Sequence, residues 1–597
     1  MTRTEDFYSS LIDKHREQLV KLNKKRALYG WLRFLSMACA ITIIWLSWSG
    51  WLIAGIPLAI IFIALFFFIL KKDLDNNDEI ENVQRLIEIN ETEIRVLHHN
   101  YTDLFDGLRL KPEHHDYAND LDIFGRASLY QYVSRCQSEQ GQKLMADWML
   151  KPASVSEIKK RQSSIKEIAK EVEWRQQLQS FGMETSISTE TELKLLKWLQ
   201  EPIKFLDSKL WKALKYILPL ISFTLLAIHI AGIIEGNIFY PAIILMMLMA
   251  FGISKQMIPV YSQLDKAAPQ LETLYKSINW IENKKFESDQ LKQLQQSFEH
   301  NNKQGSAIIK QLKKILDRFD IRLNPLVFIP LNTFLFWDIH QVLLLEKWKK
   351  ENKDHIVKWF QTLEEFETIS SLACLSFNQP TWAIPEISDE PGIFSATELG
   401  HPLIQKEKMV LNDFSSSGTS GLGLITGSNM AGKSTFLRSV GVNIVLAMMG
   451  SVVCATQMRT SHFKVLSSMR VSDNLEENTS TFYAELKKLK EIIESVYRKE
   501  DVFLLLDEIL RGTNSTDRHT GSKALIKQLI EHNAVGLIAT HDLELSKLSS
   551  EYPDLLHNYH FDVRVSGEEL SFDYKLKKGI CTSMNASLLM KKIGIEI

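Results

Sequence analysis

The chain has 597 residues, 45% of them hydrophobic and 24% charged, and its formal net charge is −2. A near-neutral chain has no global attraction to nucleic acid, so any contact with DNA would need a local basic patch. The length allows about three or four domains. The five cysteines show neither CxxC nor metal-ligand spacing, so they are expected to be reduced, buried thiols rather than zinc ligands.

Long apolar runs follow the N-terminus. Residues 1–30 are expected to form a basic helix, and residues 31–70 a first transmembrane hairpin. The runs 34–48 and 51–70 carry no charged side chain, and each is about long enough to cross the hydrocarbon core when residues 29–31 join the first. A helical hairpin buried in a large soluble core is the alternative.

Residues 71–105 are expected to form a linker or stalk helix. Apolar side chains recur there at helical spacing with many acids between them, which fits a coiled-coil stalk and an ordinary amphipathic helix equally well. The pairs His98–His99 and His114–His115 suggest metal ligands. Adjacent histidines in polar sequence are expected to be solvated instead.

A second pair of apolar runs, 216–234 and 238–253, predicts a second transmembrane hairpin within residues 211–256. Its second run is short and its first contains His229, so a buried hairpin is again the alternative.

Lysine and arginine mark one side of both hairpins. The connecting turns carry neither, whereas the flanking segments hold Lys14, Arg16, Lys21, Lys24, Lys25, Arg26, Arg33, Lys71, Lys72, Lys209, Lys212, Lys215 and Lys255. By the positive-inside rule, both termini are cytoplasmic. The chain is therefore expected to be a multi-pass protein of a bacterial inner membrane, with lipid as a partner. The basic N-terminal helix is expected to anchor on anionic lipid, and nucleic-acid binding is the alternative.

A motif for nucleotide binding lies near residue 430. A short apolar strand runs into Gly427-x-x-x-x-Gly432-Lys433-Ser434, the spacing of a phosphate-binding loop. Curled backbone N–H groups and a helix N-terminus favour an anion there, so ATP and Mg²⁺ are the expected cofactors. Lys433 is expected to act in catalysis on the β and γ phosphates, and Ser434 to ligate the metal. A glycine-rich turn before a buried helix is the alternative. The predicted nucleotide-binding residues are Gly427, Ser428, Asn429, Met430, Ala431, Gly432, Lys433, Ser434 and Thr435.

Two further apolar runs end in polar residues. Residues 502–506 lead into Asp507-Glu508, and residues 535–540 lead into His541, as expected for central parallel strands whose carboxyl ends face a ligand. Asp507 is expected to organise Mg²⁺, Glu508 to act as general base and His541 to sense the γ phosphate. A helix-capping pair and a surface histidine are the alternatives.

The segment GSNMAGKSTFLR resembles the nucleotide-binding loop of the MutS mismatch-repair ATPases. The resemblance extends to residues 400–404, Ser480-Thr481-Phe482 with Glu485, 507–514, 539–541, 121–133 and the pattern Gly141, Trp148, Pro152 and Arg161. It implies an α/β P-loop ATPase domain of MutS/ABC type over residues 386–597. It also implies an all-α lever or core domain in two parts, 106–210 and 257–385, on either side of the second hairpin. Pro325 and Pro330 are expected to break the helical pattern of the second part.

The resemblance implies dimers with composite nucleotide sites. Ser480 and Thr481 would be donated in trans towards the partner's γ phosphate, and a helix N-cap is the other interpretation. A homodimer is therefore expected, with no small-molecule substrate besides ATP. Ala431 stands where the family usually has a glycine, and nothing before the core resembles a mismatch-reading domain. The chain is thus expected to be a membrane-anchored member that lacks this domain.

The family resemblance further implies that ATP binding and hydrolysis open and close helical levers. One alternative is a membrane-tethered protein of mismatch repair that binds mismatched or branched DNA. Another is a transport ATPase of the ABC class, although Ser480-Thr481-Phe482 stands where the Leu-Ser-Gly-Gly-Gln signature would be. A nucleotide-gated scaffold is the third.

Overall fold

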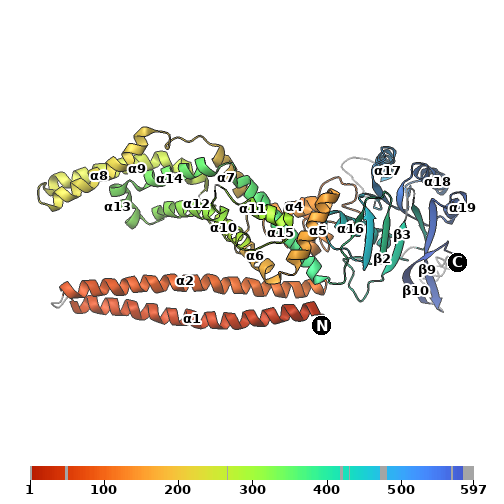
Figure 1. Ribbon diagram of the computed structural model, residues 1–597, viewed down its shortest axis with the longest axis horizontal. Helices are drawn as coiled ribbons and strands as arrows, with labels where there is room; N and C mark the ends of the chain where they lie inside the picture. Colours follow the sequence, from red (N-terminus) through yellow and green to blue (C-terminus); the bar gives the residue numbers. More distant parts are fainter. Residues whose placement is uncertain are drawn as a thin grey trace. The chain divides into compact units, whose positions relative to one another are not determined.

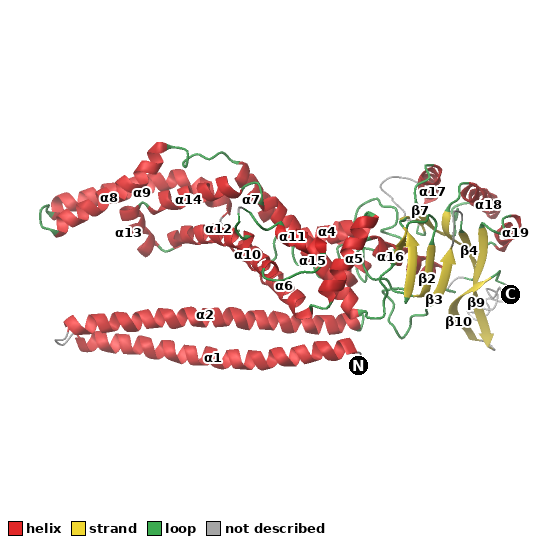
Figure 2. Ribbon diagram, viewed as in Figure 1, coloured by secondary structure: helices red, strands yellow, loops and turns green. Residues whose placement is uncertain are grey.

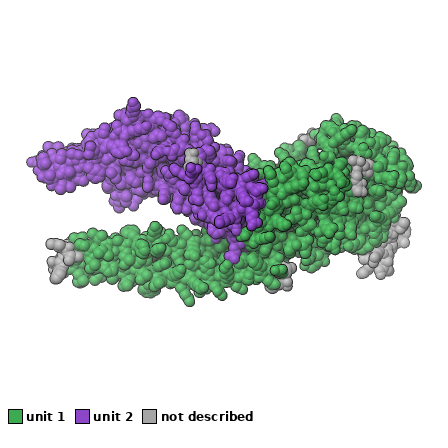
Figure 3. All heavy atoms as spheres, in the orientation of Figure 1, with its two compact units in different colours: residues 1–135, 143–172, 368–597 green, residues 136–142, 173–367 purple. Residues whose placement is uncertain are grey.

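The computed structural model describes residues 3–47, 52–264, 267–300, 302–416, 421–428, 431–470, 481–566 and 569–581. The chain divides into two compact units. Unit 1 comprises residues 1–135, 143–172 and 368–597, and unit 2 comprises residues 136–142 and 173–367 (Figure 3). Each unit combines segments that are far apart in the sequence.

Unit 1 begins with an antiparallel pair of long helices, α1 (Arg3–Ser47) and α2 (Leu52–Leu97) (Figure 1). Leu22 of α1 and Ile80 and Val83 of α2 form a buried apolar cluster between them. Each helix joins a polar half to an apolar half without interruption. The basic helix, first hairpin and stalk expected from the sequence are therefore parts of one helical pair.

Acidic side chains of α2 compensate part of the basic charge of α1. Arg16 Nη2 lies 3.0 Å from Glu91 Oε1, and Arg33 Nη2 lies 3.0 Å from Asp73 Oδ2. The expectation that the basic helix anchors on anionic lipid stays a prediction, and these two arginines have carboxylate partners in the same chain. Residues 24–26 stay exposed.

One histidine of each expected solvated pair is partly buried instead. His99 Nε2 lies 3.3 Å from the Pro402 carbonyl oxygen, and its ring stacks on Tyr132. His115 Nε2 lies 3.1 Å from the Leu150 carbonyl oxygen. Desolvation by burial lowers the pKa of both rings. Sequence alone misplaced them because their carbonyl partners are distant in the chain.

Within the part of the chain that the structure describes, four helices are long and apolar enough to cross a membrane, by length and composition. They are α1, α2 from Gly55 to Leu97, α8 (Lys209–Ile230) and α9 (Gly236–Tyr261). No more than 17% of the most apolar window of each helix is buried inside the chain, so most of these side chains face outward. The two expected hairpins fall on these helices.

Unit 2 is helical (Figure 2). Its helices are α6 (Val172–Glu184), α7 (Thr189–Gln200), α8, α9, α10 (Ala268–Glu282), α11 (Asp289–Gln296), α12 (Gly305–Phe319), α13 (Pro325–Leu335), α14 (Trp337–Asn352) and the first part of α15 (Ile356–Asn378). Trp198, Trp348 and Trp359 are fully buried in its core. Large aromatic side chains bury much apolar area and so stabilise this helical packing.

The expected break occurs at Pro325 but not at Pro330. The short helix Asp320–Leu323 ends before Asn324, which is extended, and Pro325 opens α13, where its missing N–H has no helical acceptor to lose. Pro330 lies inside the same helix. The chain turns again at Phe336, whose φ of +47° is left-handed. This second boundary forms without a proline.

The C-terminal part of unit 1 is an α/β structure with two sheets. The six-stranded sheet has the order β10 (Glu569–Lys578), β9 (Leu556–Ser566), β4 (Leu422–Thr426), β8 (Val535–Thr540), β7 (Val502–Asp507) and β6 (Lys464–Ser468). All neighbouring pairs are parallel except β10 with β9. The smaller sheet has the order β1 (Glu386–Ser388), β5 (Gln457–Ser461), β2 (Phe394–Leu399) and β3 (Asn412–Ser416). The predicted combination of an α/β domain with many helices is confirmed.

Helices cover both faces of the parallel sheet, which explains its uninterrupted apolar strands. Leu504 and Leu506 pack in one core cluster with residues of α17 (Thr481–Tyr497) and α18 (Ser515–Glu531). Leu505 faces α16 (Lys433–Met448), where a Cβ at Gly441 would lie 2.6 Å from Leu505 Cδ1. This packing fixes the carboxyl ends of β4, β7 and β8 beside one another.

The carboxylate of Glu367 in unit 2 gives the fold a pH dependence. It accepts hydrogen bonds from the Ser138 hydroxyl at 2.5 Å and the Ser138 backbone N–H at 3.1 Å. Loss of hydration nevertheless raises its pKa to about 7, from an ordinary 4.5. A raised folded-state pKa means that the stabilising contribution is full below pH 4.5 and is lost as the pH rises towards 7.

We expect the stability of unit 2 to fall by up to about 3 kcal/mol between pH 4.5 and 7 through this group. Glu367→Gln should remove that fall and make the protein more stable than wild type at pH 8. Thermal unfolding of the detergent-solubilised chain at several pH values measures both effects. Glu299→Gln, at an exposed position, is the matched control, and equal pH slopes for wild type and Glu367→Gln would contradict the assignment.

Candidate nucleotide-binding site

The loop between β4 and α16 has the backbone of a phosphate-binding turn. Gly427 has φ +147°, and a Cβ there would lie 2.9 Å from the Phe561 carbonyl oxygen. Gly432 has φ +105° immediately before α16. Ala431 is not among the positive-φ residues, so an alanine fits where relatives are expected to have glycine. Of the predicted loop, Asn429 and Met430 lie outside the described residues.

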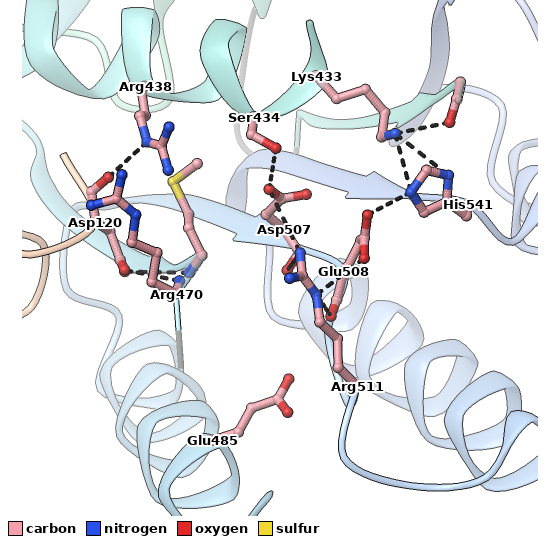
Figure 4. A network of polar contacts seen from close by, with 12 residues as sticks. Asp120, Lys433, Ser434, Arg438, Arg470, Glu485, Asp507, Glu508, Arg511 and His541 are labelled. Atoms are coloured by element: carbon pink, nitrogen blue, oxygen red, sulfur yellow. Dashed lines mark hydrogen bonds and ion pairs between the residues drawn. The ribbon is translucent and has the colours of Figure 1, made fainter. Parts of the chain in front are cut away.

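Lys433 is the first residue of α16, and its side chain turns back into the loop (Figure 4). Its Nζ donates to the carbonyl oxygens of Gly427 at 2.8 Å and Ser428 at 3.0 Å. Burial lowers its pKa to about 8, against the opposing attraction of Glu508 and Asp507. An ammonium group that has lost hydration at a helix N-terminus is suited to an incoming anion.

Ser434 and Asp507 offer oxygen ligands for a hard cation. The Ser434 hydroxyl donates to Asp507 Oδ2 at 2.5 Å. Asp507 Oδ1 is buried without a hydrogen-bond partner within the described part of the chain. Mg²⁺ prefers such oxygens, usually one or two carboxylates with phosphate and water completing its shell. These two residues therefore fit the predicted metal, and Thr435 lies exposed in the same helical turn.

Glu508 and His541 meet across neighbouring strand ends. Glu508 has φ +50°, and its N–H donates to the Ala539 carbonyl oxygen at 2.9 Å. His541 Nε2 lies 2.5 Å from Glu508 Oε1, and His541 Nδ1 lies 3.5 Å from Lys433 Nζ. Lys433 Nζ also lies 3.4 Å from His541 Nε2, so the ammonium faces the edge of the imidazole ring. The structure thus brings the predicted catalytic residues Lys433, Glu508 and His541 into one chain of polar contacts.

Arg511 is a further member of this network that the sequence did not single out. Its Nε lies 3.1 Å from Glu508 Oε2, and its Nη2 lies 3.9 Å from Asp507 Oδ2. The pKa of Glu508 is lowered, first by the hydrogen bond with His541 and also by the charge of Arg511. Glu508 is therefore held as the carboxylate that a general base requires.

Glu485 of α17 holds the loop that follows Glu508. Its side chain is 5% exposed, and Oε1 accepts from the Leu510 backbone N–H at 2.5 Å. Burial raises its pKa, and the N–H groups of Leu510, Arg511 and Gly512 act in the opposite direction. The sequence marked this glutamate only through a resemblance. A carboxylate on the sheet-facing side of an amphipathic helix was the available signal.

A second buried carboxylate, Asp120, joins the 116–122 segment to the α/β structure. Its Oδ2 accepts from the Ser467 hydroxyl and the Lys488 ammonium, each at 2.7 Å. Its Oδ1 accepts from the Arg470 backbone N–H at 3.0 Å. The Asp120 carbonyl accepts from Arg438 Nε of α16 at 3.0 Å. Only tertiary structure reveals this role, because its partners lie more than 300 residues away.

The predicted trans residues are not placed. Ser480 lies outside the described residues, and the side chain of Thr481, where α17 begins, is also not described. Their assignment to a partner's nucleotide stays a prediction.

Comparisons with known proteins agree with the position of this site. Residues 423–592 match the family model of MutS domain V. The chain is 31% identical over 271 residues to the DNA mismatch repair protein MutS of Finegoldia magna, covering 44% of this chain and 29% of that protein. It is 33% identical over 207 residues to human MutS protein homolog 4, covering 32% of this chain and 22% of that protein. The chain thus spans less than a third of the length of these curated relatives.

If Glu485 fixes the loop after Glu508, its loss should impair turnover more than nucleotide binding. We expect Glu485→Ala to lower kcat for ATP hydrolysis about tenfold, since one buried hydrogen-bonded carboxylate is worth about 1–2 kcal/mol, and to leave KM nearly unchanged. Steady-state ATPase kinetics measure this split. Glu491→Ala, at an exposed position on the same helix, should behave as wild type. An unchanged kcat in Glu485→Ala would remove the positioning role.

Proposed function

We propose that this chain, whose residues 423–592 match the family model of MutS domain V, is a Mg²⁺-dependent ATPase anchored in a membrane. The observation that carries the ATPase proposal is the convergence of Lys433, Ser434, Asp507, Glu508 and His541 at the carboxyl ends of three parallel strands. Ligands of open α/β sheets bind at such strand ends.

Each residue has a distinct part in the proposed reaction. Lys433 would exchange its contacts with the loop carbonyls for the β and γ phosphates, which compensates its lost hydration. Ser434 and Asp507 would hold Mg²⁺, whose charge neutralises developing negative charge on the phosphates. Glu508 would accept the proton of the attacking water. His541 would orient that carboxylate through their shared hydrogen bond.

The dimer is the second part of the proposal. Ser480 and Thr481 precede or begin α17, the helix whose Glu485 holds the loop after Glu508. In a homodimer, a γ phosphate bound to one chain would thereby be sensed by the α17 of the other. The helices of unit 2 are the proposed levers that such closure would drive.

Membrane anchoring rests on the four outward-facing apolar helices. A hairpin in a soluble core would bury its apolar windows, whereas at most 17% of each window is buried within this chain. Both hairpins have basic flanks and uncharged-to-acidic turns, so we place both termini and the ATPase in the cytoplasm, at a bacterial inner membrane.

A second candidate function is action on DNA, and the mismatch-repair relatives favour it. It would make the protein a membrane-tethered member of that repair class. The net charge of −2 gives no general pull towards DNA, so this function would need a basic patch on a surface not yet assigned.

ATP hydrolysis by the purified protein in nanodiscs, with and without duplex or branched DNA, tests the enzymatic proposal. We expect activity that DNA does not change and that falls at least about 100-fold in Lys433→Ala. Lys490→Ala, an exposed lysine on α17, is the control. Activity that persists in Lys433→Ala would contradict the assigned site. Stimulation by DNA that weakens steeply with salt would favour the second candidate instead.

Membrane anchoring has its own test. We expect the expressed protein to sediment with membranes and to stay there after washing at alkaline pH and high salt, because spanning apolar helices resist both treatments. Immunoblotting of pellet and supernatant measures this. Release into the supernatant at alkaline pH would exclude spanning hairpins.

A further inference from the structure

The end of unit 2 that holds α8 and α9 contains a third apolar helix, α13 (Figure 1). Phe334 of α13 packs on Phe223 of α8, with ring centroids 6.0 Å apart. Phe328 packs on Phe251 of α9, with ring centroids 6.2 Å apart. The three helices therefore share one apolar cluster.

The opposite side of α13 has no cover within the described chain. Leu326 is 89% exposed, and Leu323, just before the helix, is 84% exposed. Val327 is also exposed, at 49%. No charged residue occurs from Leu323 to Phe336. An uncharged segment with large aliphatic side chains this exposed is typical of a surface that contacts protein or membrane rather than water.

Hydrogen bonds close the polar ends of α13. The Asn332 side-chain amide donates to Ser254 Oγ of α9 at 2.9 Å, and the Asn332 carbonyl accepts from the Phe336 N–H at 3.0 Å. The Ser222 hydroxyl of α8 lies 3.4 Å from the Thr333 carbonyl oxygen. At the C-terminal end of α13, the Thr333 carbonyl and the Asn332 side chain thus have partners in neighbouring helices, as hydrocarbon surroundings demand of polar groups.

The residues that flank α13 form an ion pair. Arg322 precedes the helix and lies 3.2 Å from Asp338, at the start of α14. The guanidinium also lies over the rings of Tyr261 and Phe328, at 5.4 Å and 5.2 Å from their centroids. A carboxylate and aromatic faces are partners that let an arginine lie beside an apolar segment at a membrane–water boundary.

Helix α13 does not continue into a span. It meets α14 at 82°, and α14 carries Glu346, Lys347, Lys349, Lys350 and Glu351. With 11 residues, α13 is about 16 Å long, roughly half of a hydrocarbon core of about 30 Å. It is too short to cross by itself, and α14 does not extend it into lipid because side chains such as Ile339, Val342 and Leu345 are buried in unit 2.

We propose that α13 is a membrane-inserted half-helix, which enters the cytoplasmic leaflet beside the second hairpin and contacts lipid acyl chains through Leu323, Leu326 and Val327. This inference rests on the proposed membrane anchoring of α8 and α9. Lipid is the occupant because α13 packs directly on α8 and α9, the proposed spans, which themselves expose apolar side chains such as Leu220 and Leu248. The cytoplasmic leaflet follows because the contacts on α9 lie in its C-terminal half, next to the basic flank at Lys255.

Photocrosslinking to lipid tests the proposal. The wild-type protein is placed in liposomes of phosphatidylethanolamine and phosphatidylglycerol that contain a phosphatidylcholine with a diazirine along one acyl chain. Trypsin cuts after Arg322 and Lys347, so α13 lies in one peptide, and fragmentation can assign the label within it. We expect label within residues 323–331 and in α8 and α9, and none within residues 338–347.

A pair of variants sharpens the result. Leu326→Glu should reduce labelling of residues 323–331 at least about fivefold, because a carboxylate is unfavourable among acyl chains and moves this side of α13 towards water. Labelling of α8 should remain. Leu193→Glu changes an equally aliphatic exposed residue on α7 and should have no effect.

The outcomes separate the half-helix inference from the proposed membrane anchoring on which it rests. Label in α8 and α9 without label in residues 323–331 would overturn the half-helix and leave the anchor. Absence of label from all three helices would overturn the membrane anchoring itself.

Discussion

Burial of one ammonium group constrains the whole edge of the parallel sheet. Lys433 can lose its hydration only because two loop carbonyls accept from it and two carboxylates lie near. Those carbonyls point inward because Gly427 adopts a left-handed φ that brings the loop against Phe561. The carboxylates arrive there because β7 runs parallel to β8, buried on both faces. Packing of the strands thus places the charges, and the charges make an anion site.

The same edge is tied to distant parts of the unit by buried carboxylates. Glu485 connects α17 to the loop after Glu508, and Asp120 connects the 116–122 segment to α16, β6 and α17. A buried carboxylate satisfied by several donors fixes its neighbours more strictly than apolar contact does, because leaving one donor unpaired has a high free-energy cost. These hydrogen bonds tie α17 to the loop after Glu508, and tie α16 and α17 to the 116–122 segment.

The long apolar helices differ from the α/β structure because they expose large apolar side chains. In α1 and α2 the polar halves pair through apolar contacts and ion pairs, whereas their other halves expose large aliphatic and aromatic side chains. Unit 2 repeats this contrast between its fully buried tryptophans and the outward faces of α8, α9 and α13. Apolar surface exposed on regular helices, whose backbone groups are satisfied internally, is the observation on which the proposed membrane anchoring rests.

The sequence by itself determined the elements whose chemistry is local. Spacing alone located the phosphate-binding loop, the strands that end in Asp507 and His541, and the apolar helices, because glycine backbone freedom and burial periodicity act within about ten residues. It did not determine what depends on distant partners. Contacts made across the fold bring Arg511 and His541 to Glu508. Such contacts also determine the buried roles of Glu485 and Asp120 and the turn at Phe336. Tertiary structure decided these because desolvation and hydrogen-bond satisfaction are properties of a folded surrounding, which no single segment contains.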